Sequence, residues 1–178
     1  MSKLLAIVPA RSGSKRVPNK NIKLINGKPL VVWTLEACLK VNQIERVFLS
    51  TDSLDYWNLV KSYVNSEKLC LDLRTALTAG DDVKIFDYLK NNMEKFNTTS
   101  FSKLILALPT CPLRTNEHIY EAIQLSEKTK KPVFSACKYS FPVSFSFKIS
   151  DNNWEPLFTG NPMITGDTRS QDQTDTYH

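Results

Sequence analysis

The stretch LLAIVPARSGSKRVPNKN, residues 4–21, joins a short apolar segment directly to a basic loop. Residues 4–9 are apolar in succession rather than in alternation, which is typical of a strand buried on both faces of a parallel sheet. Residues 9–21 contain no acid and four cations, namely Arg11, Lys15, Arg16 and Lys20. This junction predicts a buried strand followed by a loop that binds an anion.

Predicted strands and helices alternate along the rest of the chain. Further apolar segments indicate buried strands at residues 46–50, 69–73, 103–108 and 133–137. Helical patterns lie between them, after Pro29, after Ser53, over residues 82–96 and after Asn116. The alternation predicts an α/β fold, a Rossmann-like and mostly parallel sheet with helices on both faces. Ligands of such folds bind beyond the carboxyl ends of the strands, where we expect loops 10–21, 51–53 and 109–114.

Several details of these helices are also predicted. Asp52 or Ser53 can cap the second helix, and Thr115 or Asn116 can cap the last one. The helix within residues 82–96 is expected to bury an apolar stripe formed by Val83, Phe86, Leu89, Met93 and Phe96.

The pattern changes after residue 140. Residues 141–158 alternate apolar and polar side chains around an Asp-Asn-Asn turn, which predicts a β-hairpin. One face would carry Val143, Phe145, Phe147 and Ile149. That face either packs on the core of its own chain or forms a subunit interface, and the pattern leaves both open. We therefore expect an α/β domain over 1–140 and a hairpin extension over 141–178.

Composition narrows the class of protein. The chain has 178 residues, 42% of them hydrophobic, which suffices for one sizeable core. No apolar stretch is long enough to span a membrane, and residues 4–10 do not resemble a signal peptide, so a cytoplasmic location is expected. The four cysteines are far apart without a CxxC pair, which predicts buried free thiols rather than zinc ligands or disulfides.

The positive charge is concentrated at one end of the sequence. Seven cations precede the first acid, Glu36, whereas the net charge of the whole chain is only +5. Nucleic-acid binders usually spread positive charge over a face or a helix. Charge gathered in one loop suits a compact polyanion such as a triphosphate better, so we expect neither nucleic acid nor membrane as a partner.

The residue types in this loop suit phosphate binding. Gly13 lets backbone amides turn toward an anion, and Arg11 can donate to two phosphate oxygens at once. Lys15 and Lys20 are mobile point charges for the same target. Asn21 offers a donor and an acceptor to a base or a ribose. The loop is neither a P-loop nor a GxGxxG turn.

Four segments together resemble one known family. AIVPARSGSKRVPNKNIKLINGKPLVVWTLEA (6–37) is similar to the opening of the cytidylyltransferases that activate sialic acids and related nine-carbon sugar acids. The segments VFLSTDS (47–53), LALPTCPLRT (106–115) and TRSQD (168–172) follow in the family's order and spacing. The resemblance covers essentially the whole chain. It implies a nucleotide-diphospho-sugar transferase type of fold, CTP and a nine-carbon sugar acid as substrates, Mg²⁺ as cofactor, and a homodimer formed through the hairpin.

The resemblance also implies roles for individual residues. The CTP phosphates would be held by Arg11, Ser12, Gly13, Ser14, Lys15 and Lys20. Arg11, Lys15 and Lys20 would be the catalytic cations, and Asn21 would touch the cytidine. Arg74 would lie beside the cytosine, and Thr110 would bind the sugar. Arg169 would reach the sugar site of the neighbouring subunit.

The sequence departs from the family pattern at four places. Leu108 stands where the family commonly has a glutamine that meets the sugar, and Ser144 replaces a lysine. Residues 75–84 (TALTAGDDVK) differ from the family segment beside the cytosine. The chain ends at residue 178, before the family's acidic magnesium ligand, so that ligand is unassigned. We expect a truncated product or an incomplete relative, and we expect Asp52 to cap a helix rather than to bind metal.

Three alternatives to this function remain at the level of sequence. A catalytically incomplete relative would bind CTP or a sugar acid without turnover. A cytidylyltransferase for another sugar acid, such as the eight-carbon Kdo, would share the same nucleotide loop. An RNA-binding protein would use the basic loop with steep salt dependence, but residues 9–21 contain no aromatic side chain to stack on bases.

Overall fold

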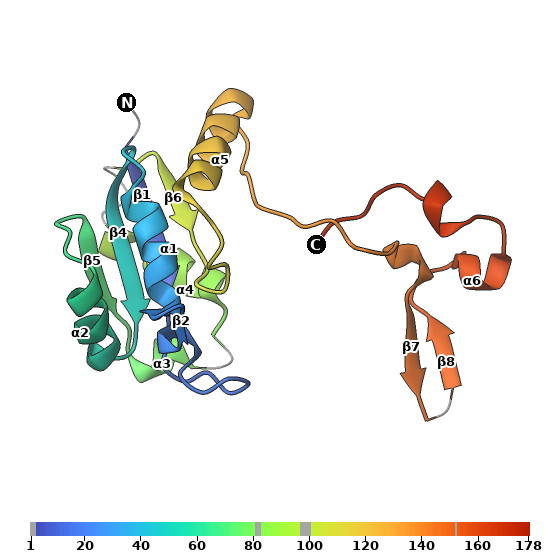
Figure 1. Cartoon of the computed structure of the whole chain (residues 1–178), viewed down its shortest axis with the longest axis horizontal. Helices are drawn as coiled ribbons and strands as arrows, with labels where there is room; N and C mark the ends of the chain where they lie inside the picture. The colour runs from blue at the N-terminus through green and yellow to red at the C-terminus, as the bar shows by residue number, and fades with distance from the viewer. Residues whose placement is uncertain (1–2, 81–82, 97–100, 152) are drawn as a thin grey trace. The chain divides into compact units, whose positions relative to one another are not determined.

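The structure is a computed structural model that describes residues 3–80, 83–96, 101–151 and 153–178 (Figure 1). The chain divides into two compact units, Met1–Lys130 and Lys131–His178. Within the described ranges no helix is both long enough and apolar enough to cross a membrane.

The first unit is built on a parallel sheet of four strands. Their order is β5 (Leu69–Leu73), β4 (Ile44–Thr51), β1 (Leu4–Pro9) and β6 (Lys103–Leu106). β1 pairs in parallel with both β4 and β6, and β4 pairs in parallel with β5. The predicted α/β fold with a central parallel sheet is confirmed.

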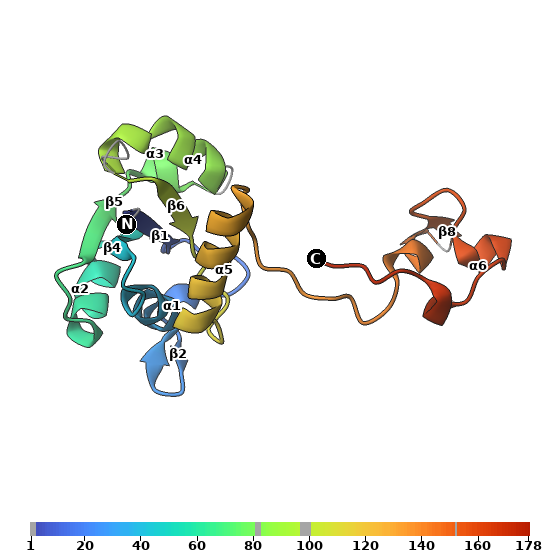
Figure 2. The same cartoon turned by 90° about the horizontal axis from the view of Figure 1, so that it is seen from above.

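Helices cover both faces of this sheet (Figure 2). One face carries α1 (Leu30–Leu39), α2 (Leu54–Tyr63) and α5 (Asn116–Thr129), and the other carries α3 (Ala76–Ala79) and α4 (Ile85–Asn91). The side chains of β1 alternate between two apolar clusters. Leu4, Ala6 and Val8 join the cluster beneath α1 and α5, whereas Leu5 and Ile7 join the cluster with α4. This double burial explains the unbroken apolar run of β1.

Two of the predicted helix caps are present. Ser53 caps α2 by accepting a hydrogen bond from the amide of Tyr56 at 3.3 Å. Thr115 caps α5, where its hydroxyl accepts from the amide of His118 and the His118 ring accepts from the Thr115 amide. The prediction of a cap at these positions is confirmed for Ser53 and Thr115 and is wrong for Asp52 and Asn116.

The helical stripe predicted within residues 82–96 is only partly present. Leu89 and Phe96 are buried as predicted, but Phe86 is 74% exposed and Met93 is also exposed. α4 ends at Asn91, and a separate 3-10 helix, η2 (Met93–Phe96), follows it. The segment is therefore not one continuous α-helix, and the spacing of an α-helix does not predict which of its side chains are buried. Asp82, at the start of the predicted segment, lies outside the described residues.

The strand predicted at residues 133–137 is absent from the structure. The last residue of this range pairs with the end of the chain instead, since Cys137 and His178 exchange two amide–carbonyl hydrogen bonds of 2.9 and 2.8 Å. The amide of Tyr139 donates to the carbonyl of Thr176 at 2.9 Å. An apolar pattern alone does not reveal which segment supplies the partner, so the prediction of a fifth strand in the sheet is wrong.

The second unit contains the predicted hairpin. β7 (Phe147–Ser150) and β8 (Asn153–Pro156) are antiparallel, and the rings of Phe147 and Trp154 lie 5.7 Å apart. Every residue of both strands is exposed. Val143 and Phe145 lie before the hairpin, in the 3-10 helix η4 (Val143–Phe145). The short helices α6 (Pro162–Thr165) and η5 (Ser170–Asp172) complete the unit.

All four cysteines are free, as predicted. Burial raises the pKa of the Cys38 thiol to about 11, so this cysteine behaves as an apolar core residue. Cys111 and Cys137 are exposed, which contradicts the prediction that the thiols are buried. Both follow the end of the regular sheet, where the sequence pattern carries little information on burial.

Replacing Leu35 on α1 with alanine tests the larger cluster. The side chain is completely buried, so Leu35→Ala should lower the free energy of unfolding by about 2–5 kcal/mol. Leu125→Ala on α5 is the control, because Leu125 is largely exposed and its loss should cost much less. Chemical denaturation followed by circular dichroism measures both, and equal losses would contradict this assignment of the core.

Candidate functional site

The carboxyl ends of the four parallel strands carry the loops that form the candidate site. In Figure 1 the arrow of β4 points toward the basic loop after β1 and toward α3. A cavity of about 320 Å³ lies at this edge. Its lining consists of Pro9, Arg11, Lys20, Asn21, Arg74, Gly80, Val83, Ile85, Leu108, Pro109 and Thr110. The site therefore sits where the fold class predicts ligand binding.

Five residues predicted from sequence meet in this cavity, although they come from three separate loops. Arg11, Lys20 and Asn21 follow β1, Arg74 follows β5, and Thr110 follows β6. The Asn21 side chain is buried and donates to the carbonyl of Arg11 at 2.9 Å. The amide of Asn21 thus holds the backbone from which the Arg11 side chain projects.

Ser12 lies in the loop but faces an acid. Its amide donates to Asp52 Oδ1 at 2.7 Å, and its hydroxyl donates to Asp52 Oδ2 at 2.9 Å. Asp52 belongs to the turn between β4 and α2, and the cap of α2 is its neighbour Ser53. Sequence reasoning missed this role of Asp52. The sequence did contain a signal for this role. Asp52 follows the predicted strand at residues 46–50, and the basic loop, which has no acid of its own, follows the predicted strand at residues 4–9.

A second contact ties the far end of the basic loop to α2. The hydroxyl of Tyr56 donates to Asn19 Oδ1 at 3.2 Å. Burial, and then the nearby Asp52 carboxylate, raise the pKa of Tyr56, which keeps this hydroxyl protonated as a donor. The basic loop is therefore attached to the β4–α2 region near both of its ends.

The middle of the basic loop lies outside the lining of this cavity. Gly13, Ser14 and Lys15 are not among the residues that line it. The Ser14 amide donates to the carbonyl of Ser12 at 2.9 Å, which forms a tight local turn. Gly13 does not have a positive φ, and a Cβ at this position would meet nothing within 4 Å. The conformational freedom expected of Gly13 is not used in this structure.

Arg74 is the most buried cation of the site. Its residue is only 7% exposed, and its Nη1 donates to the carbonyl of Thr78 at 3.4 Å. Desolvation by burial lowers the pKa of its guanidinium, with Arg11 acting in the same direction, whereas Tyr88, Asp52 and Asp72 act in the opposite direction. Arg74 Nε is buried without a hydrogen-bond partner within the described part of the chain.

Part of the cavity lining is apolar. Val83 lines it just before α4, Ile85 at the first residue of α4, and Leu108 after β6. Leu108 is 44% exposed, and its carbonyl accepts from Arg114 Nη1 at 3.2 Å. An apolar side chain therefore stands where the resemblance led us to look for a polar contact.

Arg169, the remaining predicted residue, belongs to the second unit. Its guanidinium forms two hydrogen bonds to Asp172, Nε to Oδ2 at 2.7 Å and Nη2 to Oδ1 at 3.1 Å. The side chain is largely exposed to solvent. In this structure the charge of Arg169 is thus partly balanced by an acid three residues away.

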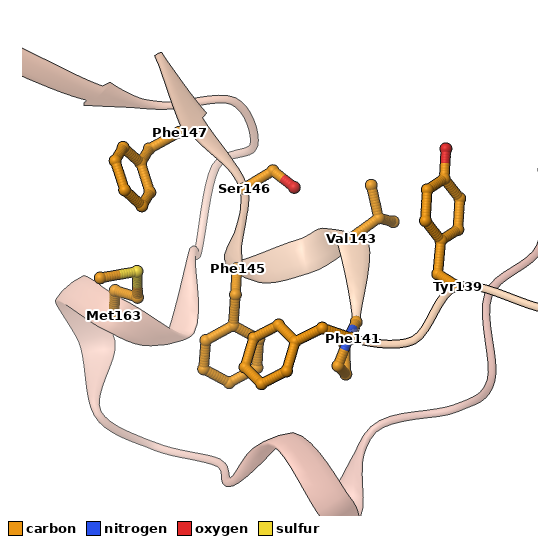
Figure 3. Close-up of a pocket in the computed structure, with 8 residues that line it drawn as sticks. Tyr139, Phe141, Val143, Phe145, Ser146, Phe147 and Met163 are labelled. Atoms are coloured by element: carbon orange, nitrogen blue, oxygen red, sulfur yellow. The ribbon is translucent and has the colours of Figure 1, made fainter. Parts of the chain in front are cut away.

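The second unit has a cavity of a different character, of about 390 Å³ (Figure 3). It is lined by Tyr139, Phe141, Pro142, Val143, Phe145, Ser146, Phe147 and Met163. The rings of Phe141 and Phe145 lie 5.2 Å apart in its wall. This lining carries no ionised side chain, so of the two cavities only the one at the sheet edge suits a phosphate ligand.

The donor set for a metal ion is weak. Within the described ranges no three acidic, histidine or cysteine side chains form a cluster that could hold one. Asp52 forms hydrogen bonds with the basic loop, and both of its carboxylate oxygens accept from Ser12. No ligand of the expected magnesium ion is therefore assigned among the described residues.

Known proteins resemble this chain in sequence. It is 36% identical to the N-acylneuraminate cytidylyltransferase of Escherichia coli O18:K1:H7 over 130 residues, which are 73% of this chain and 30% of that protein. It is 33% identical to the CMP-N,N'-diacetyllegionaminic acid synthase of Legionella pneumophila over 149 residues, which are 80% of this chain and 61% of that protein. The chain thus spans less than two thirds of the length of either relative.

The fold is also found in solved structures. The CMP:2-keto-3-deoxy-manno-octonic acid synthetase complexed with CTP superposes with a TM-score of 0.59 at 24% identity, over 72% of this chain and 49% of that one. This likeness supports the fold alone. A family model described as cytidylyltransferase matches residues 5–124, which include the basic loop, Arg74 and Thr110. The chain belongs to the cytidylyltransferase family.

Proposed function

We propose that this protein joins CTP to a nine-carbon, sialic acid-like sugar acid, giving the CMP-sugar and pyrophosphate. The observation that carries the proposal is the convergence of Arg11, Lys20, Asn21, Arg74 and Thr110 on one cavity at the carboxyl edge of the sheet. Membership of the cytidylyltransferase family supports CTP as the nucleotide substrate. The names of the two relatives support a nonulosonic acid as the acceptor.

The chemistry requires stabilisation of negative charge. The anomeric hydroxyl of the sugar attacks the α-phosphorus of CTP and loses its proton to solvent, a new P–O bond forms, and the bond to the departing pyrophosphate breaks. Charge grows on the nonbridging and leaving oxygens. Arg11 can donate two parallel hydrogen bonds to them, and Lys15 and Lys20 add positive charge. The loop also holds the two reactants in position, which lowers the entropic part of the barrier.

Mg²⁺ is part of the proposal, since it would neutralise the phosphates when bound. It is commonly held by one or two carboxylates together with phosphate oxygens. No ligand for it is assigned among the described residues, so no step above depends on it. We further propose that the protein forms a homodimer in which Arg169 of one subunit contacts the sugar bound to the other. We also propose a cytoplasmic location.

Arg11→Ala tests the proposed role of the basic loop. Loss of a forked donor to the developing charge should reduce pyrophosphate release by at least about 100-fold. Arg46→Ala is the matched control, because Arg46 is an exposed arginine on β4 outside the cavity lining. The assay uses each nucleoside triphosphate in turn with Mg²⁺ and a panel of sugar acids, and calorimetry records CTP binding in parallel.

The outcomes of that assay separate the alternatives. Unchanged turnover in Arg11→Ala would remove the loop from the mechanism. CTP binding by the unaltered chain without pyrophosphate release would favour a nucleotide-binding relative. Release only with an eight-carbon acid would favour a Kdo enzyme.

Asp52 is expected to strengthen nucleotide binding although it carries negative charge. Its contacts with Ser12, together with the contact of Tyr56 with Asn19, hold the loop before the nucleotide arrives. Asp52→Ala should therefore raise the Kd for CTP about tenfold, equivalent to about 1.4 kcal/mol. Asp52→Asn keeps one acceptor for the Ser12 amide and should cost less.

The sign of this effect decides between two roles. If charge repulsion between Asp52 and the phosphates dominated, both variants would bind CTP more tightly than the unaltered protein. Asp55→Ala is the control, because Asp55 lies in the first turn of α2 and is exposed. Calorimetry at two salt concentrations separates the electrostatic part of any change.

Mixing two inactive variants tests the proposed sharing of Arg169 between subunits. Arg11→Ala and Arg169→Ala should each be inactive alone. A hybrid dimer has one intact site of two and should recover about half of the activity, so a fully exchanged equimolar mixture should recover about a quarter. Subunit exchange is verified by mass spectrometry of differently labelled copies. No recovery despite exchange would place Arg169 outside a shared site.

A further inference from the structure

A completely buried carboxylate lies beneath the nucleotide cavity. Asp72 has an exposed fraction of 0%, and within residues 3–80, 83–96, 101–151 and 153–178 only Asp72 and Arg74 are both charged and buried. Asp72 lies in β5 and Arg74 follows directly after the strand. Their spacing of two residues is the repeat that places side chains on the same face of an extended segment.

Three different elements supply hydrogen bonds to Asp72. The hydroxyl of Ser50 on β4 donates to Oδ2 at 2.6 Å. The hydroxyl of Tyr88 on α4 lies 2.9 and 2.8 Å from the two carboxylate oxygens. Lys95 on η2 forms an ion pair with Oδ1, and its ammonium also donates to the carbonyl of Leu73 at 3.2 Å. A buried charge with this many donors is well compensated, so it can act as a rigid anchor.

Tyr88 connects this anchor to the cavity. Its hydroxyl contacts Asp72, while its ring faces the guanidinium of Arg74, whose central carbon lies 5.3 Å from the ring centroid. That distance is typical of a cation–π contact, which is strongest where water is excluded. Burial, followed by the contact with Asp72, raises the pKa of Tyr88 far above its ordinary value, so the hydroxyl remains a donor.

Arg74 retains unused donor capacity in this arrangement. Its Nη1 bonds to Thr78, but its buried Nε has no partner within the described part of the chain. Arg74 also lines the cavity, so a bound ligand can place an acceptor against the accessible part of its guanidinium. Cytosine offers two adjacent acceptors, its carbonyl oxygen and an unprotonated ring nitrogen. Uracil has an N–H at that ring position, which would face another donor.

We propose that Tyr88, anchored by Asp72, is a positioning residue that fixes the plane of the Arg74 guanidinium and thereby the preference for cytosine over uracil. This inference rests on the proposed function. A guanidinium supported on an aromatic ring keeps its donors in one plane and rejects a base whose ring nitrogen carries a proton. Without the ring, the side chain can rotate and accept other partners, so affinity for CTP falls more than affinity for UTP.

The ratio of CTP to UTP affinity is the decisive quantity, because loss of packing alone lowers stability without changing base preference. Tyr88→Leu removes the ring and should reduce the ratio about tenfold. Tyr88→Phe keeps the ring but loses the bonds to Asp72, so it should lower Tm while changing the ratio by no more than about threefold. Tyr88→Met, of similar size without an aromatic face, replaces the leucine variant if that one does not fold.

Phe96→Leu is the matched control for packing. Phe96 is buried in the same apolar cluster and has its ring 5.2 Å from that of Phe48. Its loss should lower Tm and leave the CTP to UTP ratio unchanged. Calorimetric titration of the whole chain with CTP and with UTP measures the ratio without a sugar acid or turnover.

The outcomes distinguish this inference from the proposed function. Absence of CTP binding by the unaltered protein would overturn both. Preference for CTP that persists in the leucine or methionine variant would overturn the positioning role and leave the proposed function standing. A ratio that falls equally in Phe96→Leu would show that packing, and not the ring under Arg74, sets the preference.

Discussion

The burial of β1 on both of its faces is the constraint on which the rest of the first unit depends. A strand with no face toward water needs a hydrogen-bonded neighbour on each side and a layer of helices above and below. β4 and β6 supply the neighbours, and the two apolar clusters supply the layers. The loop after β1 is therefore held at the centre of the carboxyl edge, between the ends of β4 and β6. The position of β1 in the sheet therefore places the cations of this loop at that edge.

The charges of the site are balanced across strands rather than along the sequence. The basic loop contains no acid, and this absence suggested a ligand as its counter-charge. In the fold, Asp52 at the end of β4 meets the loop through Ser12, and Asp72 on β5 lies beneath Arg74 with Tyr88 between them. These acids orient donors, and the cations Arg11, Lys20 and Arg74 line the cavity. Organisation of a cationic pocket before its ligand arrives lowers the cost of ordering it during binding.

Much of this fold could be predicted from sequence, because the pattern of apolar residues and the capping residues at helix ends indicated the same elements. β1 and β5 have the predicted bounds, and Ser53 and Thr115 act as caps. The errors arise where a partner distant in sequence decides the outcome. Cys137 pairs with the last residue of the chain, and Phe86, at the start of α4, is exposed. The gathering of Arg11, Lys20, Asn21, Arg74 and Thr110 followed from the resemblance, whereas Asp52 and Tyr88 act through contacts that span 40 and 16 residues, which no local pattern encodes.

The two layers of helices contribute differently to the core and to the cavity. The layer with α1, α2 and α5 packs on the larger cluster, whereas the segment with α3 and α4 contributes Arg74, Gly80, Val83 and Ile85 to the cavity wall. A change at Gly80, Val83 or Ile85 can therefore alter this part of the cavity without disturbing the larger cluster. The fold thus keeps one part of the cavity wall apart from the larger of its two cores.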